Sequence, residues 1–99
     1  MIMARQGIEG WSEINETGNL DALTKSFEFT SFEQASAFVQ QVSIFAENID
    51  HHPEWRTDGD GLIIHVKLTS HFANNTVTLN DFEVAQYMNQ AFSDTQTTF

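Results

Sequence analysis

A single long apolar stripe, ended by the only proline of the chain, most constrains the fold of this 99-residue sequence. The stripe has the three- and four-residue spacing that places side chains on one face of a helix. Its members are Ala35, Phe38, Val39, Val42, Phe45, Ala46 and Ile49. Two capping-box pairs precede it, Thr30 with Glu33 and Ser31 with Gln34. Because the residue before a proline avoids helical angles, this amphipathic helix must end ahead of Pro53.

Alternating polarity predicts strands on both sides of that helix, and a second stripe predicts a helix near the end of the chain. The strands are expected at Trp11 to Ile14, Leu23 to Phe29, Trp55 to Thr57 and Leu62 to Ser70. The last helix should begin where Thr78 and Asp81 form a cap, and the polar end from Ser93 to Phe99 should be frayed. The order β-β-α-β-β-α predicts an α+β fold. We expect one domain over residues 1–99, with a four-stranded antiparallel sheet and helices packed on one face.

Composition limits the classes of function that this chain can serve. Fourteen acidic residues against four basic ones give a formal net charge of −10, and the bases are scattered along the sequence. Binding to nucleic acid or to an anionic membrane surface requires clustered Lys and Arg, so neither is expected. Cysteines are absent, which excludes disulfides and thiolate chemistry. No apolar run approaches the roughly 20 residues of a membrane helix, and no secretory signal is evident, so we expect a cytoplasmic protein.

Two adjacent histidines follow the long helix, within a segment rich in acidic residues. His51 and His52 are preceded by Glu47 and Asp50 and are followed by Pro53. Histidine exchanges protons near neutral pH, whereas acids at a helix C-terminus oppose the helix dipole and so do not serve folding. We therefore interpret Glu47, His51 and His52 as candidate acid–base chemistry. Asp50 taken alone is better explained as part of a solvated helix end.

Further candidates lie on the later strand and the last helix. His71 shares strand parity with Thr69 on the face away from the helices, whereas His65, on the same side, is interpreted as a sheet-face residue. Asp81 fits a helix cap, with a second role in orienting an imidazole. Trp55 is either a flat wall for an aromatic ligand or an ordinary core residue.

A metal site is the competing explanation for these histidines. Two or three imidazoles with a carboxylate would satisfy zinc. However, consecutive histidines are a poor pair of ligands, and the familiar spacing of histidines on one helical face is absent. We therefore predict no metal. Serine nucleophiles and glycine-rich phosphate loops are also not indicated.

Taken together, these residues resemble the pterin-4a-carbinolamine dehydratases. The resemblance rests on Glu47-x3-His51-His52-Pro53-Glu54-Trp55, on a strand that ends in His71, and on Thr78-x2-Asp81. The lead-in Phe27-x-Phe29-x2-Phe32 is also similar, so the resemblance covers roughly Trp11 to Phe92. It implies a reaction that removes water from 4a-hydroxytetrahydropterin to give quinonoid dihydropterin, without a metal or organic cofactor. It also implies a homodimer or a homotetramer.

The family pattern implies roles for individual residues. His52 and His71 would be the acid–base pair, and His51 would bind and orient the pterin. Glu47 would contact the pterin ring or tune a histidine, and Asp81 would steady the site from the last helix. The remaining expected binding residues are Asp50, Pro53, Trp55 and Thr69.

The chain departs from the family pattern in three places. The stretch Arg56 to Gly61 lacks the usual aromatic residue and is about two residues longer, the usual N-terminal helix is missing or vestigial, and Asn74-Asn75 replaces a glycine. Asn tolerates left-handed backbone angles, so the last change is mild. Animal members of the family also act as dimerisation cofactors of a homeodomain transcription factor. A non-catalytic interaction module on the same fold is therefore the alternative to an enzyme.

Overall fold

The computed structural model describes residues 7–98, and it confirms the predicted α+β architecture. Strands β1 (Ser12–Ile14) and β2 (Ala22–Glu28) precede helix α1 (Phe32–Asn48), and strands β3 (Glu54–Asp58) and β4 (Ile63–Leu68) precede helix α2 (Leu79–Thr98). The sheet has the order β1-β2-β4-β3, and every neighbouring pair is antiparallel. Residues 1–6, which form most of the segment before Trp11 that departs from the family pattern, lie outside the described residues.

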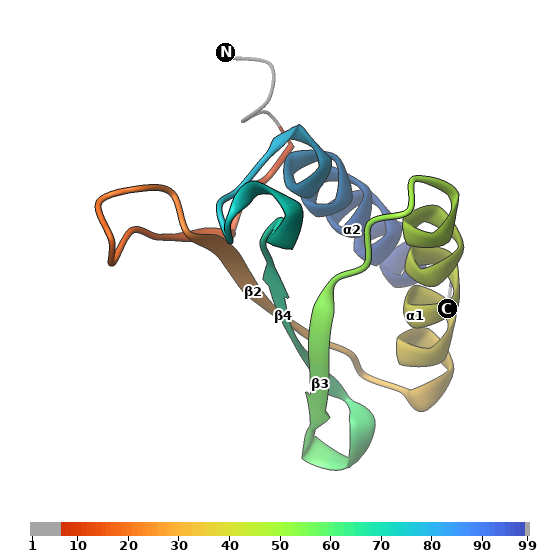
Figure 1. The fold of residues 1–99 in the computed structure, drawn as a ribbon. Coiled ribbons are helices and arrows are strands. Elements are labelled where there is room, and N and C mark those ends of the chain that lie inside the picture. The colour runs from red at the N-terminus through yellow and green to blue at the C-terminus, as the bar shows by residue number, and fades with distance from the viewer. Residues whose placement is uncertain (1–6, 99) are drawn as a thin grey trace.

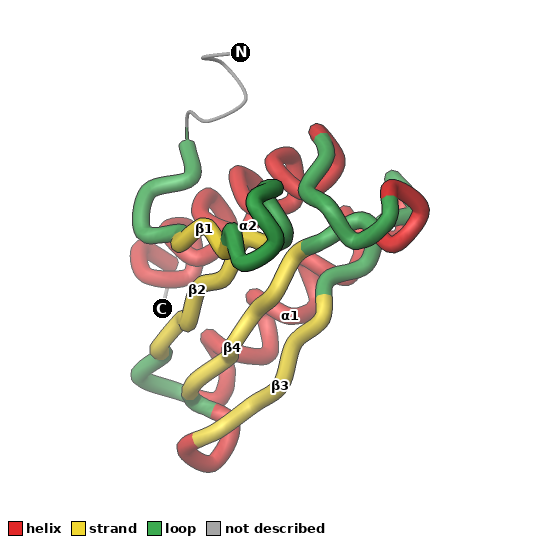
Figure 2. The backbone as a smooth tube through the Cα atoms, turned by 60° about the vertical axis from the view of Figure 1, so that its left-hand side comes forward, coloured by secondary structure: helices red, strands yellow, loops and turns green. Residues whose placement is uncertain are grey.

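The two helices cover one face of the sheet and leave the other face open (Figures 1 and 2). Leu23, Phe27, Ile64, Val66 and Leu68 of β2 and β4 point toward the helices and are buried. The helices contribute their predicted stripes to the same core, which includes a cluster of tilted and edge-on phenylalanine rings. Since one face of each element is apolar, this two-layer packing is the arrangement that removes most of the apolar surface from water.

Of the two predicted capping residues, Ser31 is the N-cap of α1. Its side chain accepts a hydrogen bond from the backbone N–H of Gln34, at 3.2 Å. The Gln34 side chain in turn accepts from the backbone N–H and the hydroxyl of Thr30, at 3.1 and 2.9 Å. Two polar residues therefore satisfy N–H groups that a helix start leaves without partners.

The C-terminus of α1 turns sharply, and this turn aims the histidine segment. The N–H of His51 donates to the carbonyl of Ala46 at 2.9 Å, and that of Asp50 donates to the carbonyl of Glu47 at 3.2 Å, the pairing of a Schellman motif. Asp50 takes the left-handed position, with φ of +53°, that glycine usually fills. Its place at the helix end therefore has a backbone explanation.

Helix α2 is longer than the sequence predicted. Residues 93–98 were expected to fray, but the helix continues to Thr98. Thr95 is buried, and its carbonyl accepts a hydrogen bond from Gln34 Nε2 at 3.5 Å. Packing against the start of α1 thus orders a polar segment that has little helix preference of its own. Phe99 lies outside the described residues.

One amide side chain joins the beginning of the described chain to α2. Asn89 Nδ2 donates to the carbonyls of Gly7 and Glu9 at 2.8 and 3.0 Å, while Oδ1 accepts from Trp11 Nε1 and Lys25 Nζ at 3.1 and 2.8 Å. Lys25, which interrupts the apolar face of β2, is accommodated in this way. Burial lowers the pKa of Lys25, and the charge of Glu9 partly opposes that shift.

Within residues 7–98, neither helix has the combined length and hydrophobicity needed to cross a membrane.

Candidate active site

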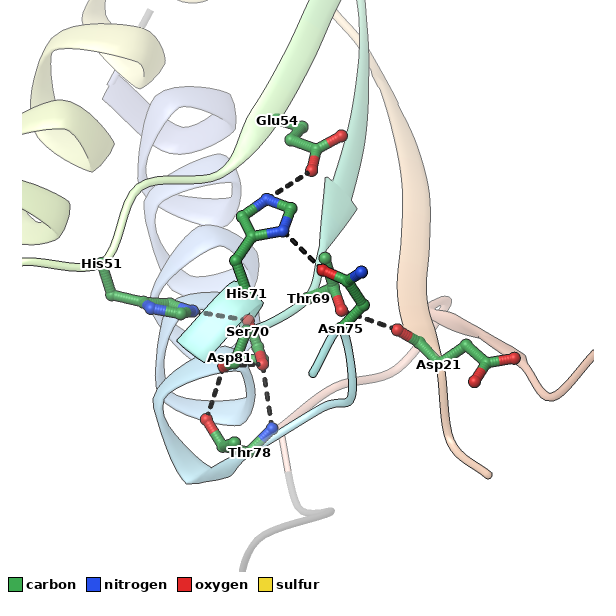
Figure 3. Close-up of polar contacts among 9 residues, drawn as sticks. All are labelled: Asp21, His51, Glu54, Thr69, Ser70, His71, Asn75, Thr78 and Asp81. Atoms are coloured by element: carbon green, nitrogen blue, oxygen red, sulfur yellow. Dashed lines mark hydrogen bonds and ion pairs between the residues drawn. The ribbon is translucent and has the colours of Figure 1, made fainter. Parts of the chain in front are cut away.

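A buried pair of one imidazole and one carboxylate lies at the centre of the site. Nε2 of His51 is 2.6 Å from Oδ1 of Asp81, and both side chains are almost completely shielded from water (Figure 3). Because a carboxylate oxygen accepts, the proton between them is best placed on Nε2. The other ring nitrogen, Nδ1, has no hydrogen-bond partner among residues 7–98. The structure thus pairs two residues that the sequence had only suggested as partners.

Asp81 also joins this pair to the end of β4. Its second oxygen accepts from the hydroxyl of Ser70 at 2.7 Å and from the backbone N–H of Thr78 at 2.9 Å. The second bond is half of the predicted cap of α2, so one carboxylate serves both the helix and the site. Ser70 is fully buried and immediately precedes His71. The network therefore holds the backbone in place immediately before His71.

His71 lies on the 3₁₀ turn η3 (His71–Ala73) and contacts an oxygen acceptor at each ring nitrogen. Nδ1 is 2.6 Å from Oδ1 of Asn75, and Nε2 is 3.2 Å from Oε2 of Glu54 (Figure 3). The imidazole is largely exposed and lines a surface hollow of about 570 Å³ together with Thr69, Glu54 and Lys67. A hollow of this size can hold a small molecule.

Thr69 and Asp21 shape the wall of that hollow. The hydroxyl of Thr69 donates to the carbonyl of Asp21 at 2.7 Å, which ties β4 to the start of β2. The hydroxyl and backbone N–H of Thr17 both donate to the Asp21 carboxylate and lower its pKa. The wall therefore carries a stable negative charge. Thr69 and His71 both line the hollow, although β4 ends at Leu68 and His71 lies on η3, beyond the end of the strand on which it was predicted.

His52, Glu47 and Asp50 are exposed at the end of α1. Nε2 of His52 is 3.3 Å from Oε1 of Glu47, and more than half of each side chain is accessible to water. Pro53 is half-buried and leads into β3. The first histidine of the pair is thus buried while the second faces solvent, which agrees with the opposite directions expected of neighbouring side chains in an extended segment.

Trp55 lies on the other side of β3 from Glu54. Its ladder partner is Val66, a core residue, and the indole packs against the core as a half-buried side chain. This position corresponds to the core-residue interpretation of Trp55. An aromatic ring that does lie beside the site belongs to Phe72, which is 73% exposed and meets the His51 ring edge-on, with centroids 6.2 Å apart.

All four histidines of the chain are within 4 Å of a carboxylate, but His65 lies apart from the others. It contacts Ser26 at 2.6 Å and Asp58 at 3.5 Å on the open sheet face, as expected for a sheet-face residue. A second hollow, of about 620 Å³, lies on this face and includes His65 but none of the other three histidines. Among the described residues, no group of three or more His, Asp or Glu side chains is arranged to hold a metal ion.

Sequence reasoning missed four residues that the structure brings to this site: Ser70, Asn75, Phe72 and Glu54 as a partner of His71. Ser70 could have been found from strand parity, because it continues the inward-facing series that ends at Leu68. Asn75 has a positive φ of +60°, a conformation that asparagine tolerates, but no periodic pattern reports where its side chain points.

A family model described as pterin 4 alpha carbinolamine dehydratase matches residues 2–91 of this sequence. The chain belongs to this family. A relative from Rhodopseudomonas palustris, provisionally named a pterin-4-alpha-carbinolamine dehydratase, is 42% identical over 86 residues, covering 87% of this chain and 79% of the relative. A relative from Brucella ovis with the same provisional name is 35% identical over 89 residues, covering 90% and 86% of the two chains.

Solved structures share the fold of this family member. A crystal structure of a transcriptional coactivator/pterin dehydratase from Brucella melitensis has a TM-score of 0.76 and 35% identity, covering 92% of this chain and 90% of the other. A pterin dehydratase-like protein identified as a RuBisCO assembly factor in the alpha-carboxysome has a TM-score of 0.66 at 19% identity, covering 85% and 90%. The second likeness concerns the fold alone.

Proposed function

We propose that this protein is a 4a-hydroxytetrahydropterin dehydratase that recycles a tetrahydropterin cofactor. The observation that carries the proposal is the network in which Asp81 binds both His51 and Ser70, the residue before His71. One buried carboxylate thereby joins the imidazole of His51 to the residue that precedes His71. Membership of the family gives this arrangement its substrate class, a pterin with a hydroxyl group on C4a.

The reaction requires one proton donor and one proton acceptor. The acid protonates the departing hydroxyl as the C4a–O bond breaks, and the base takes the proton from N5 as the C4a–N5 double bond forms. Water and quinonoid dihydropterin leave, and exchange with solvent restores both groups. The protein needs no external oxidant or reductant, because the substrate loses only the elements of water.

We assign the base to His51 and the acid to His71, which differs from the roles that the family pattern implied, namely His52 with His71 as the acid–base pair and His51 as a binding residue. Asp81 holds Nε2 of His51 and leaves Nδ1 without a partner among the described residues, which suits an acceptor. Among the described residues, every side-chain nitrogen or oxygen that is shielded from water has a hydrogen-bond partner. Since Nδ1 of His51 has no such partner, it is accessible to water. His52 with Glu47, exposed at the end of α1, would bind the pterin. We also propose roles in binding for Asp50, Pro53 and Thr69, and the position of Trp55 against the core limits it to shaping the site.

The test is to follow the absorbance of freshly generated 4a-hydroxytetrahydropterin with and without the protein. Wild type should accelerate dehydration, and His51→Ala or His71→Ala should lower kcat by about 10²–10⁴-fold, the usual contribution of general acid–base catalysis. His65→Ala is the matched control, since His65 also contacts a carboxylate but lies outside the site. Equal rates with and without wild-type protein would refute the dehydratase.

That negative outcome would favour the alternative, a non-catalytic interaction module on the same fold. Binding of a dihydropterin analogue to wild type separates the two, because an interaction module has no need of the ligand. We further propose a homodimer or homotetramer, for which sedimentation equilibrium is the direct measurement.

A further inference from the structure

His71 differs from the other histidines because both of its ring nitrogens face an oxygen that can only accept. The two oxygens are Oδ1 of Asn75 at 2.6 Å and Oε2 of Glu54 at 3.2 Å. A neutral imidazole carries one N–H and would satisfy only one of them. The pair of contacts is therefore complementary to a ring with a proton on each nitrogen, the form that can donate.

The direction of the Glu54 side chain is not explained by the sheet. On the ladder, Glu54 lies opposite Lys67 on the open face, and a cross-strand ion pair would be the ordinary outcome. No ion pair within 4 Å joins them in the described structure. The carboxylate instead extends to His71, with Oε2 3.2 Å from Nε2 of the ring. Glu54 is thus directed at the imidazole although a lysine is its register partner.

His51 shows the opposite arrangement. It has one acceptor, Asp81, at Nε2, and its Nδ1 lacks a partner among residues 7–98. The surroundings of His71 therefore suit a proton donor, whereas those of His51 suit a proton acceptor. A dehydration that needs one of each uses both environments.

We propose that Glu54 and Asn75 are positioning residues that hold His71 as the proton donor toward the departing hydroxyl. This inference rests on the proposed dehydratase function. In the step itself, the C4a oxygen takes the place of Glu54 as the acceptor at Nε2 and receives that proton as the C–O bond breaks, which leaves a neutral ring whose remaining proton, on Nδ1, is held by Asn75. Glu54 then faces a nitrogen without a proton, an unfavourable contact that favours reprotonation from solvent.

The test compares Glu54→Gln with Asp58→Asn. Asp58 is the matched control because it also contacts a histidine, His65, from the other end of β3. Glu54→Gln should lower kcat by about fivefold or more with little change in KM, since an interaction of the acid with its partner is not a contact to substrate. Asp58→Asn should keep the wild-type kcat, and both variants should unfold at the wild-type temperature. Asn75→Gly, which suits the positive φ, should give a smaller loss.

A second readout does not depend on turnover. In ¹⁵N NMR spectra, Glu54→Gln should change the ring-nitrogen signals of His71, because Nε2 lies 3.2 Å from Oε2 of Glu54, and Asp58→Asn should leave those signals as in wild type. If wild type accelerates dehydration but Glu54→Gln matches it in kcat and in these spectra, the role of Glu54 is refuted while the dehydratase stands. If wild type does not accelerate dehydration, the function fails, and the spectra alone decide whether Glu54 holds the His71 ring.

Discussion

Replacement of Asp81 by alanine is the most informative test of the buried network. The carboxylate is completely shielded and accepts from His51, Ser70 and the backbone of Thr78. The Ser70 hydroxyl has another partner at 2.7 Å, the hydroxyl of Thr78, so two donors lose their acceptor in the variant. An unsatisfied buried donor costs about 1–3 kcal/mol. We therefore expect Asp81→Ala to lower the free energy of unfolding by about 2–6 kcal/mol.

Urea denaturation followed by circular dichroism measures this loss directly. For a domain of this size, each kcal/mol changes Tm by about 4–8 °C, so the melting temperature should fall by about 8 °C or more. Glu83→Ala is the matched control, an exposed carboxylate two residues further along α2, and should change the free energy of unfolding by less than about 0.5 kcal/mol. If Asp81→Ala stays within about 0.5 kcal/mol of wild type, the carboxylate does not hold the network, and our account of the site is wrong.

Two further predictions concern stability. Asp50→Gly should raise the free energy of unfolding by about 0.5–1 kcal/mol, because glycine adopts the left-handed position without a steric cost and removes a negative charge from the C-terminus of α1; urea denaturation would show the gain, and a loss would contradict the assigned turn. Burial lowers the pKa of Lys25 in the folded chain, so the unfolded chain binds the proton more tightly and stability should rise with pH through the window that ends near the ordinary value of 10.5. The difference in unfolding free energy between wild type and Lys25→Met, measured at several alkaline pH values, should show that slope, and a constant difference would exclude it.

The local parts of this fold could be predicted because their signals are local. The stripe of α1, the cap at Ser31 and the alternation of side chains along β4 all follow from residues within a few positions of one another. The helical end of α2 could not be predicted, since the burial of Thr95 depends on a contact with Gln34, 61 residues earlier. Local preference is overridden there by packing.

The candidate site could likewise be predicted only in part. The sequence identified His51, His52, His71 and Asp81 as candidates, but the partner of each histidine depends on how distant elements meet. His51 and Asp81 are 30 residues apart. Glu54 and Lys67 illustrate the limit most clearly, because the ladder register predicts a pair between them and the side chain of Glu54 extends elsewhere. Register determines which residues are neighbours, whereas side-chain direction depends on every competing charge nearby.

The four hydrogen bonds of Asn89 have a consequence for the kinetics of folding. They connect residues separated by between 64 and 82 positions, so we expect them to form late, when α2 docks onto the rest of the fold. Interactions that are absent from the transition state affect the unfolding rate far more than the folding rate. We therefore expect Asn89 to slow unfolding. Its loss would shorten the lifetime of the folded protein and leave the folding rate almost unchanged.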